Sequence, residues 1–76
     1  MKNLMEFLVG EIAGSENFEV NEESNDHEVV ITITATQSVV GLIIGKQGKT
    51  IKNLRKIASI KGVLDKKTVR LNVVEK

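Results

Sequence analysis

The chain has 76 residues, no cysteine and a formal net charge of +1. This length predicts one small domain, residues 1–76, and leaves no room for a two-domain enzyme. A content of 41% hydrophobic and 28% charged residues indicates a globular fold, and the lack of cysteine excludes disulfides and thiolate metal sites. Glu6 and Glu11 interrupt the apolar N-terminal stretch, and no apolar run approaches the ~18 residues of a membrane span. We therefore expect a cytoplasmic protein with no membrane partner.

The two signs of charge are sorted along the chain. Residues 1–30 hold one basic and eight acidic residues, whereas residues 31–76 hold ten basic and two acidic residues. Such asymmetry suggests an anionic partner for the basic half, while the acidic half limits indiscriminate binding to polyanions. The alternative is that both halves are solvated faces that pair loosely with each other.

The first half of the chain predicts a helix followed by two strands. Apolar residues recur every four positions in Lys2–Ala13, which predicts an amphipathic helix that Gly14 ends. Phe18 and Val20 alternate with polar residues and predict a short strand, and the polar segment 22–27 predicts a turn. The strongest strand signal is at 28–35, where apolar residues alternate with Val30, Thr32 and Thr34.

The second half predicts two helices and a strand. Thr36 is placed to cap a short helix that ends at Ile44. A second helix is predicted over 49–61, with Gly62 as its end, and its apolar stripe contains Ile51, Leu54, Ile57 and Ala58. A last strand is predicted over 67–74. The order α-β-β-α-α-β predicts an α+β fold in which three helices cover one face of a three-stranded sheet.

The segment Gly45-Lys46-Gln47-Gly48 lies between the two predicted helices. Two glycines permit a tight turn without Cβ clashes, and backbone N–H groups next to a helix N-terminus form a donor site for phosphate oxygen. Lys46 adds a positive charge, and the amide of Gln47 can reach sugar or phosphate. The alternative is a helix corner in which the glycines serve geometry alone.

The helix after this turn favours the phosphate-binding interpretation. At 100° per residue its lysines fall within about 60° of one another, opposite the stripe of Leu54 and Ala58. Arg55 lies nearer the edge of that stripe, and residues 37–63 contain no acid. This pattern is typical of a surface that follows a nucleic-acid backbone. The lysines are Lys49, Lys52 and Lys56.

The run from Val40 to Leu54, VGLIIGKQGKTIKNL, resembles the signature of KH domains, in which an apolar pair precedes a G-x-x-G loop and Ile follows three residues after it. The element order is similar to the type II KH fold, and the whole chain resembles the small stand-alone bacterial KH proteins called KhpA. The resemblance implies binding of single-stranded RNA, about four nucleotides long, with the loop on the phosphates. It also implies cytoplasmic location, self-association, and pairing with a larger KH protein of the Jag or KhpB kind in the control of cell shape and division.

Further residues are assigned to the RNA site with alternatives left open. Aromatic residues make up 3% of the chain and lie away from the loop, so we expect bases to rest on aliphatic surface such as Val40, Ile43, Ile44 and Ile51, although each of these also suits a core. Gly41 permits close approach of RNA or of another helix. Arg70 is a candidate for phosphate contact or a simple strand decoration.

Catalysis, a cofactor and a small-molecule substrate are not expected. Gly48-Lys49-Thr50 imitates the end of a P-loop, but that motif needs a glycine at residue 43, which is Ile. One histidine and no cysteine leave nothing from which to assemble a metal cage or a nucleophile with its base. The two remaining hypotheses are a non-catalytic RNA-binding protein, acting as a post-transcriptional regulator or RNA chaperone, and a protein-interaction adaptor whose main role is homo- or heterodimerisation.

Overall fold

The computed structural model describes residues 1–14 and 17–76, so Glu16 of the acidic segment lies outside it. The predicted α+β order is confirmed, with a single 3₁₀ turn, η1, inserted at Lys46–Gly48. The elements are α1 (Lys2–Ala13), β1 (Phe18–Ser24), β2 (Glu28–Ala35), α2 (Gln37–Ile44), α3 (Lys49–Leu64) and β3 (Thr68–Glu75). This arrangement is consistent with a type II KH fold.

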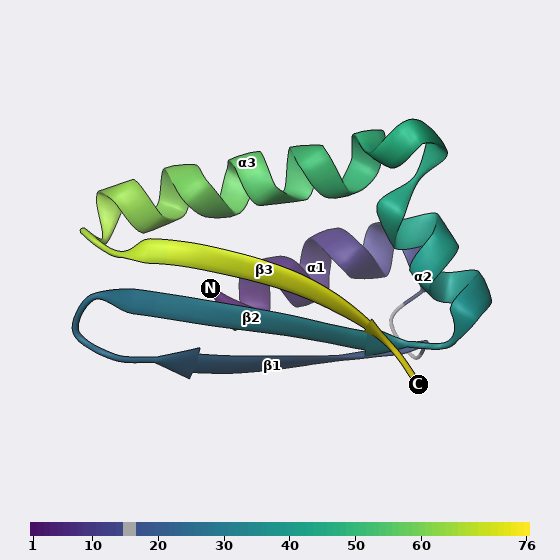
Figure 1. Ribbon diagram of the computed structural model, residues 1–76, viewed down its shortest axis with the longest axis horizontal. Helices are drawn as coiled ribbons and strands as arrows, with labels where there is room; N and C mark the ends of the chain where they lie inside the picture. The colour runs from purple at the N-terminus through teal and green to yellow at the C-terminus, as the bar shows by residue number, and fades with distance from the viewer. Residues whose placement is uncertain (15–16) are drawn as a thin grey trace.

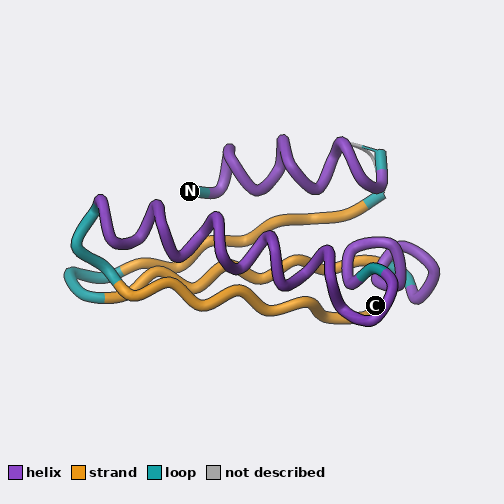
Figure 2. The backbone as a smooth tube through the Cα atoms, turned by 90° about the horizontal axis from the view of Figure 1, so that it is seen from above, coloured by secondary structure: helices purple, strands orange, loops and turns teal. Residues whose placement is uncertain are grey.

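The three strands form one mixed sheet in the order β1-β2-β3. β1 pairs antiparallel with β2 through a hairpin, and β2 pairs parallel with β3. A parallel pair needs a long crossover, and here α2, η1 and α3 provide it. The helices lie on one face of the sheet, with α1 on the β1 side and α3 crossing obliquely above β2 and β3 (Figures 1 and 2).

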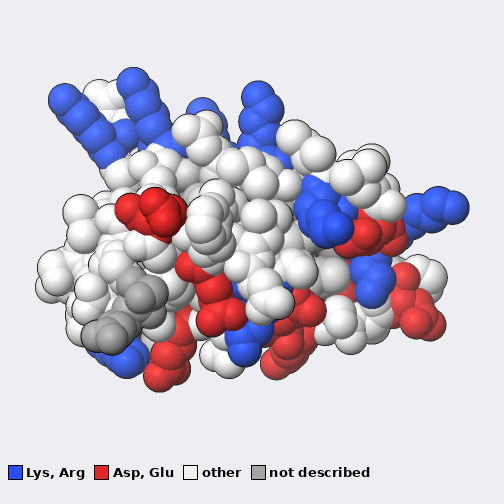
Figure 3. All heavy atoms as spheres, turned by 180° about the vertical axis from the view of Figure 1, so that it is seen from behind, with Lys and Arg blue, Asp and Glu red and all other residues white. Residues whose placement is uncertain are grey.

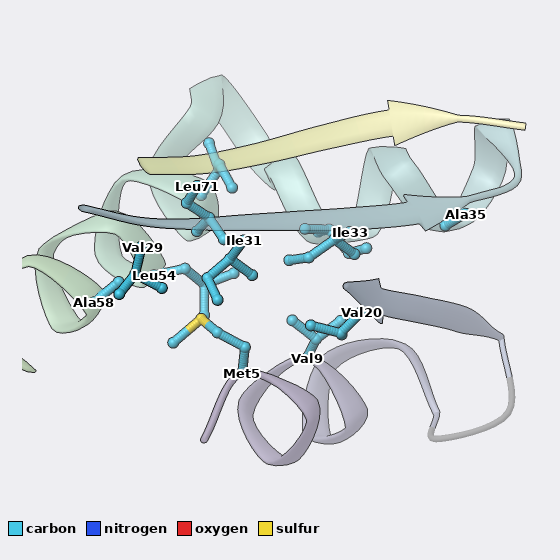
Figure 4. Close-up of a cluster of buried hydrophobic side chains, with 12 residues drawn as sticks. Met5, Val9, Val20, Val29, Ile31, Ile33, Ala35, Leu54, Ala58 and Leu71 are labelled. Atoms are coloured by element: carbon cyan, nitrogen blue, oxygen red, sulfur yellow. The ribbon is translucent and has the colours of Figure 1, made fainter. Parts of the chain in front are cut away.

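The core lies between this sheet face and the helices. Alternate residues of β2, from Val29 to Ala35, point into it, while Val30, Thr32 and Thr34 stay half-buried on the open face. Met5 and Val9 of α1 reach the same cluster from below, as Figure 4 shows. Burial of these apolar side chains supplies most of the favourable free energy of folding. The buried set is Met5, Val9, Val20, Val29, Ile31, Ile33, Ala35, Ile43, Ile51, Leu54, Ala58 and Leu71.

The first strand is longer than its sequence pattern predicts. β1 continues to Ser24, and only residues 25–27 form the turn, where Asn25 Oδ1 accepts hydrogen bonds from the backbone N–H groups of His27 and Glu28. The prediction of a turn over 22–27 was therefore wrong at its start. β1 is an edge strand whose second half is exposed, so pairing with Val29–Ile31 holds Glu22–Ser24 extended without an apolar alternation.

The end of α3 also differs from the prediction. Gly62 does not stop the helix, which runs on to Leu64. Gly62 is buried where β3 crosses the helix, and a Cβ there would collide with Val69. The left-handed cap is Lys66, with φ 58°, and the bonds Lys66 N–H to Val63 O and Lys67 N–H to Gly62 O complete a Schellman motif. β3 accordingly begins at Thr68, one residue later than predicted.

Several apolar residues of α3 lie outside the face of the helix that packs in the core. Ile51, Leu54 and Ala58 are buried as predicted, but Ile57 is exposed, which corrects its assignment to the core stripe. Ile60 and Leu64 continue the exposed apolar side, spaced three and four residues apart, with Val63 beside them. Within the described ranges, no helix is both long and apolar enough to cross a membrane.

Candidate nucleic-acid interface

The turn between α2 and α3 has positive φ at two glycines and also at one residue that is not glycine. Gly45 and Gly48 both have positive φ, 77° and 73°, as expected for glycine. Gln47 also adopts a left-handed conformation, with φ 58° and ψ 24°. A non-glycine residue in this region is uncommon and carries strain, and such strain is concentrated at functional sites.

The turn uses some of its amides internally and leaves others free. Gly48 N–H donates to Gly45 O at 3.1 Å, and Lys49 N–H donates to Lys46 O. Across the described parts of the chain, the N–H groups of Lys46 and Gln47 have no such acceptor. The sequence predicts that the turn exposes its amides. In the structure this applies to the N–H groups of Lys46 and Gln47, which lie beside the positive end of α3.

The three glycines of the signature have different roles. A Cβ at Gly45 would collide with the Thr50 side chain, so the turn is packed tightly against the first turn of α3. A Cβ at Gly48 or Gly41 would meet nothing within 4 Å. Gly41 is exposed, so it does not serve helix packing within this chain, and that interpretation was wrong. Its bare backbone surface remains open to another molecule.

The lysines of α3 continue from the turn along the exposed side of the helix. Lys49, Lys52 and Lys56 are all exposed and lie opposite the buried stripe of α3. Ion pairs hold Lys61, Arg70 and Lys76. In the described part of the chain, by contrast, the row of Lys49, Lys52 and Lys56 has no acidic partner within 4.0 Å, and neither has Lys46. Figure 3 shows basic side chains projecting from the top of the molecule, where α3 lies, while the acidic ones lie at mid-height and below, among further basic ones. The field of this surface therefore favours a polyanion.

A groove of about 440 Å³ runs beside the lysine row, between α3 and the outer edge of β3. Its helix side is formed by Arg55, Ala58 and Ser59, and its strand side by the consecutive residues 69–72. The groove is open to solvent, and no acidic side chain is among the residues that line it.

The strand side of the groove offers unpaired backbone groups. Thr68 N–H and Lys76 N–H donate to His27 O and Ala35 O, so even-numbered residues of β3 direct their N–H and C=O groups toward β2. In a parallel ladder the intervening residues then point the opposite way. Val69 and Leu71 therefore present both a donor and an acceptor to the groove. The guanidinium of Arg55 reaches one of these acceptors, because its Nε donates to Leu71 O at 3.4 Å.

The structure places the remaining predicted site residues in different environments. Ile44 is 38% exposed beside the loop, but Ile51 is only 8% exposed and packs in the core beneath it, as does Ile43. Ile51 therefore supports the turn from within and does not offer a base-contact surface. Arg70 lies on the open face of the sheet, where Nε contacts a carboxylate oxygen of Glu28 at 3.0 Å. Its backbone lines the groove, but its side chain does not join the lysine row.

Three polar residues of the groove were not assigned to the site from the sequence: Arg55, Ser59 and Asn72. No motif marks them. Arg55 and Ser59 are four residues apart on the side of α3 that faces β3, so helical angles together with knowledge of the neighbouring strand would have identified them. Asn72 required the β2–β3 pairing, which the alternation within a strand does not reveal.

Two comparisons bear on this geometry. A family model described as the KH domain of KhpA and KhpB matches residues 2–73. Among curated proteins, the chain is 29% identical to the RNA-binding protein KhpA of Halalkalibacterium halodurans over 76 residues, which cover 99% of this chain and all of that protein. The match extends beyond the loop to every helix and strand described above.

Proposed function

Because this chain belongs to the KhpA/KhpB KH-domain family, we propose that it is a non-catalytic protein that binds single-stranded RNA through the turn at residues 45–48. The observation that carries the proposal is a surface on which three features follow one another. They are two amides and a row of lysines for which the described residues offer no acceptor or acidic partner, and an open strand edge. Backbone donors and cations recognise phosphate, and the strand edge recognises bases. One domain over residues 1–76 is sufficient for this activity.

The proposed path places phosphates on the turn and bases in the groove. Lys46 and Gln47 amides hold one phosphate, and Lys49, Lys52 and Lys56 line the approach over about 10 Å, since each helical residue rises ~1.5 Å. A KH module clamps about four nucleotides. Ile44 and Gly41 provide the exposed aliphatic and bare surface beside the first of them. Arg70 joins the phosphates only if it leaves Glu28.

Base contacts in this groove differ from those of aromatic platforms. Leu71 directs an adjacent N–H and C=O outward, a donor–acceptor pair that matches the edge of one base. Without aromatic stacking, affinity per domain is modest, and pairing two domains raises avidity without new contacts.

The proposal includes association with a second KH domain. The exposed apolar side of α3 supports it, because Val63 and Leu64 are 73% and 74% exposed and continue a row begun by Ile57 and Ile60. The partner is a second copy or a larger KH protein of the Jag or KhpB kind. By resemblance to this family, the assembly acts in the cytoplasm as a post-transcriptional regulator or RNA chaperone in cell shape and division control.

The decisive experiment reverses charge at the turn. Lys46→Asp with Gln47→Asp keeps both side chains exposed but sets two carboxylates against phosphate, so RNA binding is expected to be lost while the melting temperature changes little. A matched control is Asn3→Asp with Lys66→Asp, which changes net charge equally at sites away from the groove. If the turn variant binds RNA as well as this control, the assignment of the loop is wrong.

The second candidate function is a protein adaptor that binds RNA only incidentally. The exposed apolar side of α3 favours it. A steep loss of RNA affinity with added salt supports the RNA-binding function. By contrast, complexes whose size is unchanged by nuclease, and whose partner exchange is blocked by loop variants, would support the adaptor.

A further inference from the structure

One acceptor on the strand edge of the groove is already engaged, because Arg55 contacts the carbonyl of Leu71. The guanidinium extends from α3 across the groove, and Nε donates to the outward carbonyl of Leu71. This contact joins residues 16 positions apart and links the helix side of the groove to the strand side. A base N–H that takes the same approach to this carbonyl has to displace the guanidinium.

The contact is weak enough to be exchanged. Its length of 3.4 Å exceeds the 2.7 to 3.2 Å typical of N–H···O bonds. Arg55 is an exposed residue, and within the described ranges it has no carboxylate partner, unlike Arg70, which Glu28 holds. The carbonyl of Leu71 belongs to an edge strand, so without Arg55 only water would satisfy it.

The geometry points to Arg55 as a latch that a nucleobase releases. In the free protein, the Nε–H of Arg55 donates to Leu71 O. When RNA binds, an amino or imino N–H of a base donates to that carbonyl instead. The guanidinium of Arg55 then moves to a phosphate of the same strand. This inference rests on the proposed function and adds a residue that discriminates a strand carrying bases from a bare polyanion. The exchange conserves hydrogen bonds, because one donor replaces another on Leu71 O and the freed donor gains a phosphate oxygen.

Arg55 is located where its guanidinium can contact Leu71 O in the free protein and a phosphate in the RNA complex. Lys52 and Lys56, one turn before and one residue after it, belong to the exposed row that follows the phosphates. A guanidinium that leaves Leu71 therefore remains within a side chain's length of the expected strand. It also has the planar fork that suits phosphate oxygens, which an ammonium lacks.

The test uses the side-chain N–H signals of arginine in NMR spectra of the whole protein. The chain has two arginines, Arg55 and Arg70, so each Nε–H resonance is assigned from an Arg→Lys variant, and Arg70 serves as the internal reference. The probes are a mixed-sequence RNA of eight nucleotides and an abasic strand of the same length. We expect RNA to shift the Lys46 and Gln47 amides and the Arg55 Nε–H with one dissociation constant. The abasic strand is expected to shift the amides alone.

Each other outcome contradicts the latch in a distinguishable way. If RNA shifts the loop amides but not Arg55 Nε–H, the latch is wrong and the loop assignment stands. If the abasic strand releases Arg55 as completely as RNA does, phosphate attraction opens the contact and bases do not. If neither the loop nor Arg55 responds to RNA, the proposed function itself fails and the latch falls with it.

A binding series measures the transfer to phosphate. Arg55→Met removes the guanidinium but keeps an unbranched side chain, and it should weaken RNA binding about 10-fold, as expected for one charge-assisted hydrogen bond. Arg55→Lys should recover part of the loss. The matched control Lys61→Met removes one charge from the same helix outside the groove and should cost no more than about twofold. Equal or tighter RNA binding by Arg55→Met, at an unchanged melting temperature, would refute the transfer.

Discussion

The two edges of the sheet have the same kind of unpaired backbone and opposite surroundings. The β3 edge borders a groove with Arg55 and Arg70 and no acid, and the lysine row of α3 lies above it. The β1 edge borders a groove of about 340 Å³ between α1 and residues 18–21, where two acidic residues, Glu6 and Glu19, face a single basic one, Lys2. An exposed strand edge invites pairing with another chain. The side chains around each edge therefore decide which ligand it attracts, and the acidic one repels a polynucleotide.

The first prediction tests whether the charge around each edge decides RNA affinity, by removing charge from one edge at a time. Changing Lys49, Lys52 and Lys56 together to Gln should weaken RNA binding about 100-fold at low salt and flatten its salt dependence, because fewer counterions are released. Glu19→Gln with Glu23→Gln, on the acidic edge, should strengthen binding no more than a few-fold. Filter binding over a salt series measures both. Equal responses from the two edges would show that net charge alone, and not its location, governs affinity.

The second prediction concerns the backbone that presents the basic edge. Gly45→Ala adds a Cβ that collides with Thr50 at a residue with φ 77°, so it should reduce the free energy of unfolding by about 2–3 kcal/mol. Gly41→Ala is the matched control, because its Cβ meets nothing within 4 Å and alanine favours the helix. Urea unfolding compares them. Similar stabilities would contradict the tight packing of the turn against α3.

The third prediction concerns the contribution of the acidic edge to the stability of the fold. Glu22 Oε1 accepts a hydrogen bond from Lys2 N–H at 2.8 Å, which ties the first turn of α1 to β1. Glu22→Ala should therefore cost about 1 kcal/mol of stability, measured by thermal unfolding, and leave RNA affinity unchanged. Glu23→Ala, for which the described residues show no such bond, should have little effect. A change in RNA affinity without loss of stability would assign this edge a direct role in binding.

The smallest expected effect lies at the cap between α3 and β3. Lys66 holds a left-handed conformation with φ 58°, so Lys66→Gly should stabilise the fold by up to about 1 kcal/mol. Lys67→Gly, at a residue without positive φ, should destabilise it slightly. Thermal unfolding measures the pair. If both changes destabilise equally, the backbone strain at Lys66 is not relieved by glycine.

The sequence predicted the order of elements because each amphipathic segment has its own periodicity. Lys2–Ala13 and the strand at 28–35 match the structure at both ends. The errors occur where tertiary contacts override local signals. Pairing with β2 extends β1 through exposed Glu22 and Glu23, and the crossing of β3 turns Gly62 from an expected helix end into a packing site.

The candidate site was predicted as far as one continuous segment could define it. The glycine turn and the lysine row lie within residues 45–56, so spacing alone places them together. The groove could not be predicted in this way, because Arg55 and Leu71 meet only after β3 has paired with β2. Burial of Ile51 likewise depends on the packing of α3 against the sheet, which the motif does not encode.

The parallel pairing of β2 with β3 also orders events during synthesis. The turn and α3 leave the ribosome before β3, yet the groove has no second wall until β3 has added beside β2. Closing that pair across the residues between Ala35 and Thr68 costs chain entropy that the early segments cannot offset by themselves. A nascent chain therefore exposes its lysines first and completes the groove last, so the RNA binding that we propose for this groove waits for the completed fold.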